Sequence, residues 1–373
     1  MRRVLPMHFN RMPLEDWFDR YQYEVDYDIG ESGIKFANLE KLGIRIGRLD
    51  LRYGYHTGSP ELRQLISELY EDVSPEQIAV TTGSSESNFA LIASLVGDSD
   101  HMIVEHPNYC SLYEVPRSLD RSHDLFPLSF EEGFVPDIAR LSSLVRPNTK
   151  LITLTHPNNP TGSVIQEKQL QEIARLAERS HAYLLHDETY RELSFEKPPP
   201  AAVELSDHAI SMTTMSKAYG LPGIRIGWVA GPRHIVEAVR KVREQITICN
   251  NSVGEAIACA ALRKRDVVLR RARESVKRNF QTLKAWMNAQ KTLEWIEPRG
   301  GVVAFPRLKS GQDTEELCRL LVRKYRTFTI PGYCFEMKRH MRVGFGGRAG
   351  ELKAGLERLG KAAQDLALLR GGT

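Results

Sequence analysis

The chain has 373 residues, of which 42% are hydrophobic and 26% charged. This is the ordinary composition of a globular protein with two domains, or with one large domain and a smaller partner. The net charge of +4 is small for this length, and no block of lysine and arginine stands out. We therefore do not expect nucleic acid as a partner. We expect a small-molecule ligand instead.

Membrane association and secretion are also not expected. No apolar run approaches the roughly 18 residues that a membrane span needs, and the first residues lack the apolar core of a signal peptide. The five cysteines are scattered and form no Cys-x-x-Cys motif. This usage predicts a reduced, cytoplasmic protein with neither a disulfide framework nor a metal site.

From about residue 77 the sequence alternates short β-rich runs with helical stretches. The predicted strands are residues 77–83, 101–107, 150–157, 182–188, 209–216 and 225–231. Helical patterns at 85–96 and 166–180 lie between them, and the second is amphipathic at helical spacing. Such alternation predicts an α/β fold of three layers, in which a mostly parallel sheet is covered by helices on both faces.

After residue 231 the pattern changes. Residues 233–247 and 254–290 look helical, and short strand-like runs follow at 301–308, 327–332 and 341–346. We interpret this part as a smaller α+β domain that also includes the N-terminal segment. The predicted division is a large cofactor-binding domain at 45–275 and a small domain made of 1–44 plus 276–373.

Polar residues follow the strands at the edge where ligands bind in a parallel α/β sheet. In chain order they are Ser84 and Ser85, Tyr109, Asn159, Asp187 and Lys217. Each alone has an ordinary structural explanation: a helix cap, a single loop aromatic, a proline turn or a solvated surface lysine. Their convergence at one sheet edge is what indicates a binding site.

Together these residue types fit one cofactor. A lysine can form a Schiff base with an aldehyde, and an aspartate keeps a pyridine nitrogen protonated, so that the ring accepts electrons. Small residues entering a helix bind phosphate, Asn159 can donate to a ring oxygen, and Arg225 can reach back to the phosphate. The predicted cofactor is pyridoxal 5'-phosphate.

The motifs at 158–162 (NNPTG), 187–190 (DETY), 215–228 (MSKAYGLPGIRIGW) and 341–346 (MRVGFG) resemble the fold type I pyridoxal-phosphate enzymes, the aspartate aminotransferase superfamily. The resemblance implies that Lys217 carries the cofactor, that Asp187 holds the ring nitrogen and that Tyr109 stacks on the ring. It also implies that Asn159 and Tyr190 face the ring hydroxyl. The residues implied around the phosphate are Ser84, Ser85, Thr214, Ser216 and Arg225.

Two further features come from the same resemblance. Arg342 matches the arginine that grips the substrate α-carboxylate with two parallel bonds. Tyr53 and Tyr55 both fit the position of a tyrosine that reaches the phosphate of a partner subunit, and Tyr55 is favoured. Because sites of this family are shared between subunits, the resemblance implies a homodimer.

Stretches at 12–21, 27–34, 216–228, 297–308 and 329–345 are similar to capreomycidine synthase and related cyclases, which make cyclic guanidino amino acids of the enduracididine and streptolidine types from hydroxylated arginine. The run TTGSSES at 81–87 departs from that pattern, since a residue expected before the glycine is missing. The leading hypothesis is cyclisation of a hydroxyarginine. A guanidinium would then need an acidic lining, for which the candidates are Glu15, Asp16, Asp28 and Glu31; the alternative is that these acids form a solvated face.

Two other functions stay open. An aminotransferase that passes the amino group to a 2-oxo acid would use the same lysine, aspartate and arginine. A pyridoxal-phosphate-sensing transcription regulator would carry a DNA-binding domain ahead of the core, but the residues before about position 50 are few and not strongly basic.

Overall fold

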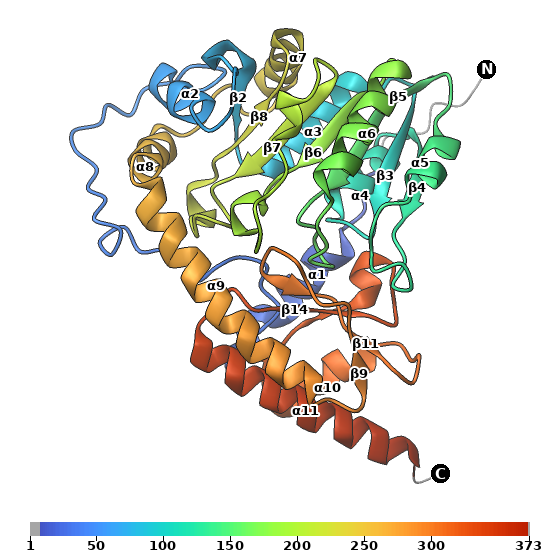
Figure 1. Cartoon of the computed structure of the whole chain (residues 1–373). Coiled ribbons are helices and arrows are strands. Elements are labelled where there is room, and N and C mark those ends of the chain that lie inside the picture. Colours follow the sequence, from blue (N-terminus) through green and yellow to red (C-terminus); the bar gives the residue numbers. More distant parts are fainter. Residues whose placement is uncertain (1–7, 372–373) are drawn as a thin grey trace.

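The computed structural model describes residues 8–371 and contains a seven-stranded sheet with the order β2-β8-β7-β6-β5-β3-β4 (Figure 1). The strands are β2 (Ile78–Thr81), β3 (His101–His106), β4 (Ser122–Pro127), β5 (Thr149–Thr155), β6 (Tyr183–Asp187), β7 (Ala209–Thr214) and β8 (Gly227–Ala230). Strands such as β5 are apolar on both faces and almost wholly buried. The predicted three-layer α/β fold is confirmed.

Strand β8 is the antiparallel member of this sheet. It pairs antiparallel with both β2 and β7, whereas the other neighbours are parallel. The start of β8 therefore lies at the edge where the neighbouring strands end. Arg225, two residues before β8 begins, is brought to the ligand-binding edge by this reversal.

Helices cover both faces of the sheet. The chain moves from β2 to β3 in one direction along the strand order, and from β5 to β6 in the other. Because such crossovers are right-handed, helix α3 (Ser84–Leu95) and helix α6 (Glu167–Arg179) lie on opposite faces (Figure 1). The remaining helices of this part are α2 (Pro60–Ser67), α4 (Ser111–Ser118), α5 (Ile138–Leu144), α7 (Arg233–Glu244) and α8 (Ser252–Leu262).

Two elements differ from the sequence-based expectation. Strand β4 was not predicted, because as an edge strand it is only half buried and lacks a continuous apolar run. The helical stretch predicted at 254–290 is two helices, α8 and α9 (Arg265–Asn288), which are separated at residues 263–264. The helical periodicity carries on across this break, so the sequence pattern does not reveal it.

The lower part of the molecule in Figure 1 combines segments from the N-terminal and C-terminal parts of the chain. Its elements are α1 (Pro13–Tyr21), β1 (Tyr27–Asp28), β9 (Leu293–Glu294), β10 (Val303–Ala304), β11 (Arg307–Leu308), α10 (Glu315–Tyr325), β12 (Thr327–Phe328), β13 (Ile330–Pro331), β14 (Met341–Gly344) and α11 (Ala349–Gly371). Strand β1 pairs with β12, which ties the N-terminal segment to the C-terminal part. The predicted domain boundary at 275 falls inside the long helix α9, and the division into two domains stays a prediction.

No helix among residues 8–371 is both long enough and apolar enough to cross a bilayer. All five cysteines lie within this range, and each is free.

Two glycines let residues 28–34 pass close to the strand β14. A Cβ atom on Gly344 would lie 1.9 Å from the carbonyl oxygen of Glu31, and one on Gly346 would lie 2.2 Å from that of Gly33. The backbone N–H of Gly344 donates to the Ile29 oxygen at 2.7 Å. These contacts fix the position of Glu31, which matters for the site described below.

We predict that Gly344→Ala lowers the free energy of unfolding by about 1–3 kcal/mol, because the backbone of 29–33 must move to admit the methyl group. It should also weaken cofactor retention, although it touches no predicted cofactor-binding residue. Gly347→Ala is the matched control, since a Cβ there meets nothing within 4 Å. Urea unfolding and cofactor absorbance measure both effects, and equal behaviour of the two variants would contradict the close approach.

Candidate active site

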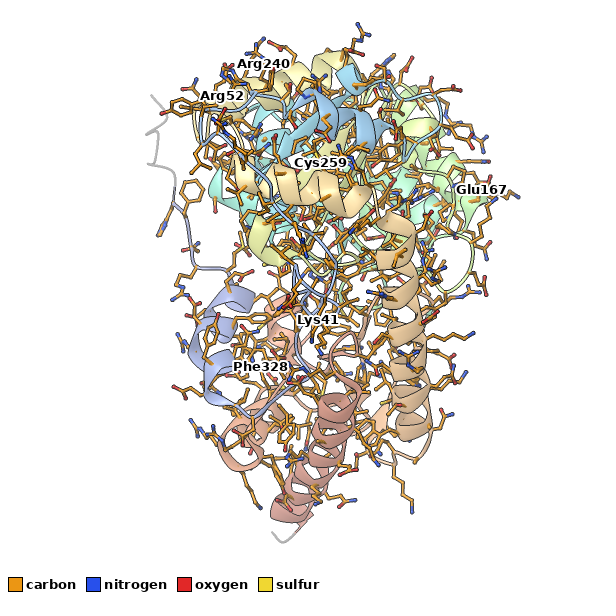
Figure 2. All side chains as sticks on the ribbon, turned by 90° about the vertical axis from the view of Figure 1, so that its left-hand side faces the viewer. Lys41, Arg52, Glu167, Arg240, Cys259 and Phe328 are labelled. Atoms are coloured by element: carbon orange, nitrogen blue, oxygen red, sulfur yellow. The ribbon has the colours of Figure 1, made fainter. Side chains whose placement is uncertain are left out.

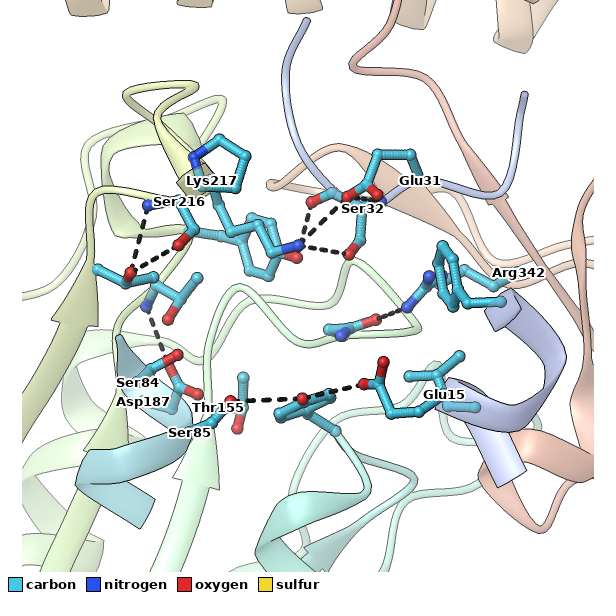
Figure 3. Close-up of a pocket in the computed structure, with 18 of the residues that line it drawn as sticks. Glu15, Glu31, Ser32, Ser84, Ser85, Thr155, Asp187, Ser216, Lys217 and Arg342 are labelled. Atoms are coloured by element: carbon cyan, nitrogen blue, oxygen red, sulfur yellow. Dashed lines mark hydrogen bonds and ion pairs between the residues drawn. The ribbon is translucent and has the colours of Figure 1, made fainter. Parts of the chain in front are cut away.

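A pocket of about 530 Å³ lies where the sheet meets α1 and β14. The strands β2, β3, β5, β6 and β7 end at it, and β8 begins at it. Figure 3 shows side chains from these strand ends facing others from α1, the segment around Glu31, and β14. The predicted site residues that line it are Glu15, Glu31, Ser84, Ser85, Tyr109, Asn159, Asp187, Tyr190, Thr214, Ser216, Lys217, Arg225 and Arg342.

One end of the pocket gathers donors suited to a phosphate. Ser84 is the first residue of α3, so its N–H and that of Ser85 have no partner within the helix. The hydroxyls of Thr214 and Ser216 lie 3.0 Å apart at the end of β7. The predicted phosphate-binding residues are therefore close together in space.

Arg225 lies over this end of the pocket. Its Nη1 donates to the Pro222 oxygen at 3.0 Å, and a Cβ on Gly83 would approach its Nη2 to 2.5 Å. Gly83 adopts a φ of +79° as the cap of α3, a conformation that favours glycine. The glycine thus allows the guanidinium to lie directly against the helix N-terminus.

The carboxylate of Asp187 is buried at the end of β6. It accepts a hydrogen bond from the Thr189 N–H at 3.0 Å. Burial raises the pKa of Asp187 above its ordinary value, although the bonds from Thr189 act in the opposite direction. A buried carboxylate that faces a pocket is stabilised by a cationic N–H from a ligand, which is what a protonated pyridine ring offers.

Lys217 points at residues of the N-terminal segment (Figure 3). Its Nζ lies 3.3 Å from Glu31 Oε1 and 3.0 Å from Ser32 Oγ. Burial by itself lowers the pKa of Lys217, but the charge and hydrogen bond of Glu31, together with the interaction with Tyr190, outweigh it and leave the pKa raised. Burial raises the pKa of Glu31, but Lys217 and Arg342 outweigh it and leave the pKa lowered. Without a ligand the two groups form an ion pair.

Arg342 is buried on β14 and faces Asn159. Its Nη1 donates to Asn159 Oδ1 at 3.1 Å, and its Nη2 donates to the Gly30 oxygen at 2.9 Å. Its Nε–H has no partner among the described residues. Tyr190 lies nearby, and its hydroxyl donates to the Ser32 oxygen at 2.8 Å. A buried guanidinium with a free N–H suits an anionic group such as an α-carboxylate.

Helix α1 forms the opposite wall. It is anchored by Trp17, whose indole N–H donates to the Thr329 oxygen at 2.9 Å. Glu15, Phe18 and Asp19 face the pocket from the same side of the helix. The Tyr109 hydroxyl donates to Glu15 Oε1 at 3.2 Å, and burial, followed by the Glu15 charge, raises the pKa of Tyr109.

Four other candidates lie away from the pocket lining. Asp28 accepts from the N–H groups of Gly30 and Glu31 at 2.8 and 3.0 Å, so its carboxylate shapes the turn that presents Glu31. Asp16 pairs with Arg11 and Arg20 on the outer side of α1. Tyr53 and Tyr55 lie on the surface, in the extended segment before α2, with 84% and 58% of their area exposed.

The pocket also contains residues that the sequence did not single out: Leu14, Phe18, Asp19, Gln22, Tyr23, Ser32, Thr155, Thr189 and Pro222. Some could have been found. Phe18, Asp19 and Gln22 follow Glu15 at helical spacing on one face of α1 and at its C-cap, and Thr155 ends β5 just before a motif already noticed. Ser32 had no such signal, because its role depends on a contact between distant parts of the chain.

The donor set fits pyridoxal phosphate. The phosphate end provides serine and threonine hydroxyls, free helix N–H groups and Arg225, while Asp187 provides a buried anion and Lys217 an amine. The pocket therefore has a donor or a charge for each polar group of this cofactor.

Comparison with known proteins agrees with the site. The model of the aminotransferase class I and II family matches residues 23–359. The chain belongs to this family. It is 30% identical over 362 residues to capreomycidine synthase of Streptomyces vinaceus, which covers 94% of this chain and 93% of the relative.

Two solved structures are also similar. A PLP-dependent aminotransferase from Streptococcus suis 89-1591 superposes with a TM-score of 0.92 and 32% identity, covering 96% of this chain and 99% of the other. The PLP-dependent cyclase OrfR superposes with a TM-score of 0.89 and 25% identity, covering 97% and 99%. The chain is thus a pyridoxal-phosphate-dependent enzyme of fold type I, as predicted.

We predict that Asp187→Asn has opposite effects on the two forms of the enzyme. A carboxyl group whose pKa is raised on folding stabilises the protein at low pH, and this contribution is lost as the pH rises through the folded-state pKa. At neutral pH the variant should therefore melt roughly 1–3 °C higher than the wild type without cofactor, and bind the cofactor more weakly.

Melting curves of cofactor-free protein and a cofactor titration measure the two effects. Asp207→Asn, at an exposed loop position, is the control and should change neither. A cofactor-free Asp187→Asn protein that melts lower than the wild type would contradict this account.

Proposed function

We propose that this enzyme closes a hydroxylated arginine into a cyclic guanidino amino acid with loss of one water. The observation that carries the choice of a cationic substrate is the charge of the pocket. Its positive residues are already matched: Lys217 by the cofactor, Arg225 by the phosphate and Arg342 by the α-carboxylate. Among the lining residues that the structure describes, no cation remains for an acidic side chain, as aspartate or glutamate would require.

The acidic groups point to a cationic substrate instead. Glu15 forms no ion pair within the described residues, and its polar partner is the hydroxyl of Tyr109. Asp19 lies on the same face of α1 at the pocket mouth, where it is paired with Arg11. A guanidinium that enters between them would gain charge-assisted hydrogen bonds to carboxylate oxygens.

The similarity to capreomycidine synthase and to the cyclase OrfR supports cyclisation. The similarity to an aminotransferase of nearly the same fold supports the alternative, in which the amino group is transferred to a 2-oxo acid. The acidic wall at α1 favours a cationic amino acid under either reaction.

We assign the following roles within this proposal. Pyridoxal phosphate supplies an aldehyde that links to amines and a ring that accepts electrons. Arg342 holds the α-carboxylate, and Lys217 Nζ takes the Cα proton. Glu15 holds the guanidinium at the far end, so that one of its nitrogens can replace a hydroxyl on the side chain. Asn159 and Tyr190 lie where they can orient the ring oxygen.

The direct experiment is incubation of the enzyme with arginine, with its hydroxylated forms, and with aspartate plus 2-oxoglutarate. We expect a hydroxyarginine product that has lost one water and kept every nitrogen, detected by mass. Release of a keto acid with stable conversion of the cofactor to its amine form would contradict cyclisation and support the aminotransferase.

Matched variants on α1 test the guanidinium site. Glu15→Gln should raise KM for the cationic substrate roughly 10- to 100-fold, the worth of a hydrogen bond to a charged group. Asp16→Asn, one residue along on the solvent side, should leave KM unchanged. Equal KM values for the two variants would exclude Glu15 as the guanidinium partner.

We also propose that the enzyme is a homodimer. The segment 45–55 has no regular secondary structure and exposes Ile46, Leu51, Tyr53 and Tyr55. It lines one surface groove together with Ser252 and Cys259, and the nearby sequence positions Ile246, Ile248 and Val253 are also exposed. In Figure 2 the labelled Arg52 and Cys259 mark this face. Exposed apolar side chains gathered on one face are typical of an interface, and a second copy of the chain is the proposed occupant.

In such a dimer Tyr55 would reach the phosphate of the partner. Light scattering should give about twice the chain mass of 42.3 kDa. Tyr55→Phe should weaken cofactor binding about 10-fold or more, the worth of a hydrogen bond to a charged group. Tyr53→Phe, two residues away, is the matched control, and a loss confined to Tyr53→Phe would reverse the assignment.

A further inference from the structure

We propose that Glu31 is a second catalytic residue, which donates the proton that turns the departing hydroxyl into water. This inference rests on the proposed cyclisation. Hydroxide is a poor leaving group at neutral pH, so loss of the hydroxyl needs a positioned acid. Lys217 is occupied with the Cα proton, and the acid must therefore be another group.

The geometry places Glu31 at the correct end of the substrate. Its Oε1 lies 3.3 Å from Lys217 Nζ, the atom assigned to Cα. Its loop is held by Arg342, whose Nη2 donates to the Gly30 oxygen at 2.9 Å. Glu31 therefore lies between Arg342, which holds the α-carboxylate, and Lys217, which acts at Cα, so it would face the first side-chain carbon of the substrate. Glu15 faces Tyr109 on another wall of the pocket (Figure 3).

The other acids of the pocket are committed elsewhere. The hydroxyl of Tyr190 donates to the Ser32 oxygen and that of Tyr109 to Glu15. Asp187 accepts from the Thr189 N–H and is the residue that would hold the ring nitrogen of the cofactor. Of the acidic side chains that line the described pocket, Glu31 is the one in contact with the lysine.

The position of Glu31 is also fixed. The Ser32 N–H donates to its Oε1 at 2.8 Å, and the Asp28 carboxylate binds the backbone N–H of Glu31. On the other side, the close approach of Gly344 leaves no room for the loop to move inward. A rigid acid next to a rigid base is the arrangement that proton transfer requires.

The protons balance around the cycle. Once the substrate amine has replaced Lys217 on the cofactor, Lys217 is an ammonium and Glu31 a carboxylate; one proton then passes from the lysine nitrogen to the carboxylate oxygen and gives a neutral amine and a carboxylic acid. The amine takes the Cα proton, the Cα electron pair forms a double bond to the next carbon, and the C–O bond breaks as Glu31 protonates the hydroxyl. The guanidine nitrogen then adds to that carbon, its proton returns to Glu31, and Lys217 returns its proton to Cα. The net change is loss of one water.

The test separates two partial reactions of the holoenzyme. Exchange of the Cα hydrogen in deuterated water needs Lys217, whereas water loss from a 3-hydroxyarginine also needs the acid. In Glu31→Gln we expect water loss slowed at least about 100-fold. Cα exchange should stay within about 3-fold of the wild type, because the variant also lacks the charge that favours the ammonium form of Lys217, and the lysine can give its proton to water instead. Ser32→Ala removes the other neighbour of Lys217 and should slow both steps equally.

Two further measurements use different chemistry. Chloride leaves without a proton, so Glu31→Gln should release chloride from 3-chloroalanine at close to the wild-type rate. In cofactor-free protein, Glu31→Gln should let formaldehyde and cyanoborohydride methylate Lys217 several-fold faster, because a neighbouring negative charge no longer favours the ammonium. Lys264, which donates to backbone oxygens at 42 and 43, serves as the internal reference for peptide mass analysis.

If Glu31→Gln slows Cα hydrogen exchange and water release by the same factor, Glu31 acts only through Lys217 and the proposal is overturned. Wild-type rates for both reactions in Glu31→Gln would overturn it as well. If the wild type exchanges the Cα hydrogen but releases no water from any hydroxyarginine, cyclisation itself is wrong. That outcome is distinct, because it is seen before any variant is compared.

Discussion

The pocket depends on the clamping of residues 28–34 between β14 and the end of β7. This segment brings Glu31 and Ser32 to Lys217, and it is held by Arg342, Tyr190 and two glycines that permit backbone contact. None of these contacts is local in sequence. The strand ends of the sheet provide the cofactor-binding residues. Helix α1, residues 28–34 and strand β14 complete the pocket with charged side chains that would face the substrate.

Charge balance explains how one cradle can serve different reactions. Removal of the Cα proton needs only a lysine, a buried aspartate and a clamp for the α-carboxylate, and these come from the sheet and β14. What happens next depends on the wall supplied by α1 and residues 28–34. In this chain that wall is acidic, with Glu15 and Asp19 at the mouth and Glu31 at the lysine. The part of the pocket that distinguishes substrates therefore comes from a helix and a loop outside the central sheet.

The sheet and most of the pocket could be predicted because short local sequence patterns indicate both. A buried parallel strand is a continuous apolar run, and polar residues that line the pocket follow such runs, so Asp187 and Lys217 were candidates by position and their convergence at one sheet edge indicated a site. The edge strand β4 lacks that run, and the break between α8 and α9 leaves the helical period intact. Both depend on tertiary surroundings that no local pattern records.

The acidic candidates show where sequence reasoning reaches its limit. Glu15 and Asp16 are neighbours, yet only Glu15 faces the pocket, because Leu14 and Trp17 fix the rotation of α1 by burying its inner side. Asp28 and Glu31 lie in one short loop, but the carboxylate of Asp28 is used by the backbone of the loop itself. The carboxylate of Asp28 is thus a structural requirement for the position of Glu31, because the turn that Asp28 holds presents Glu31 to Lys217. Such a division of roles follows from hydrogen-bond geometry, which charge patterns along the chain do not contain.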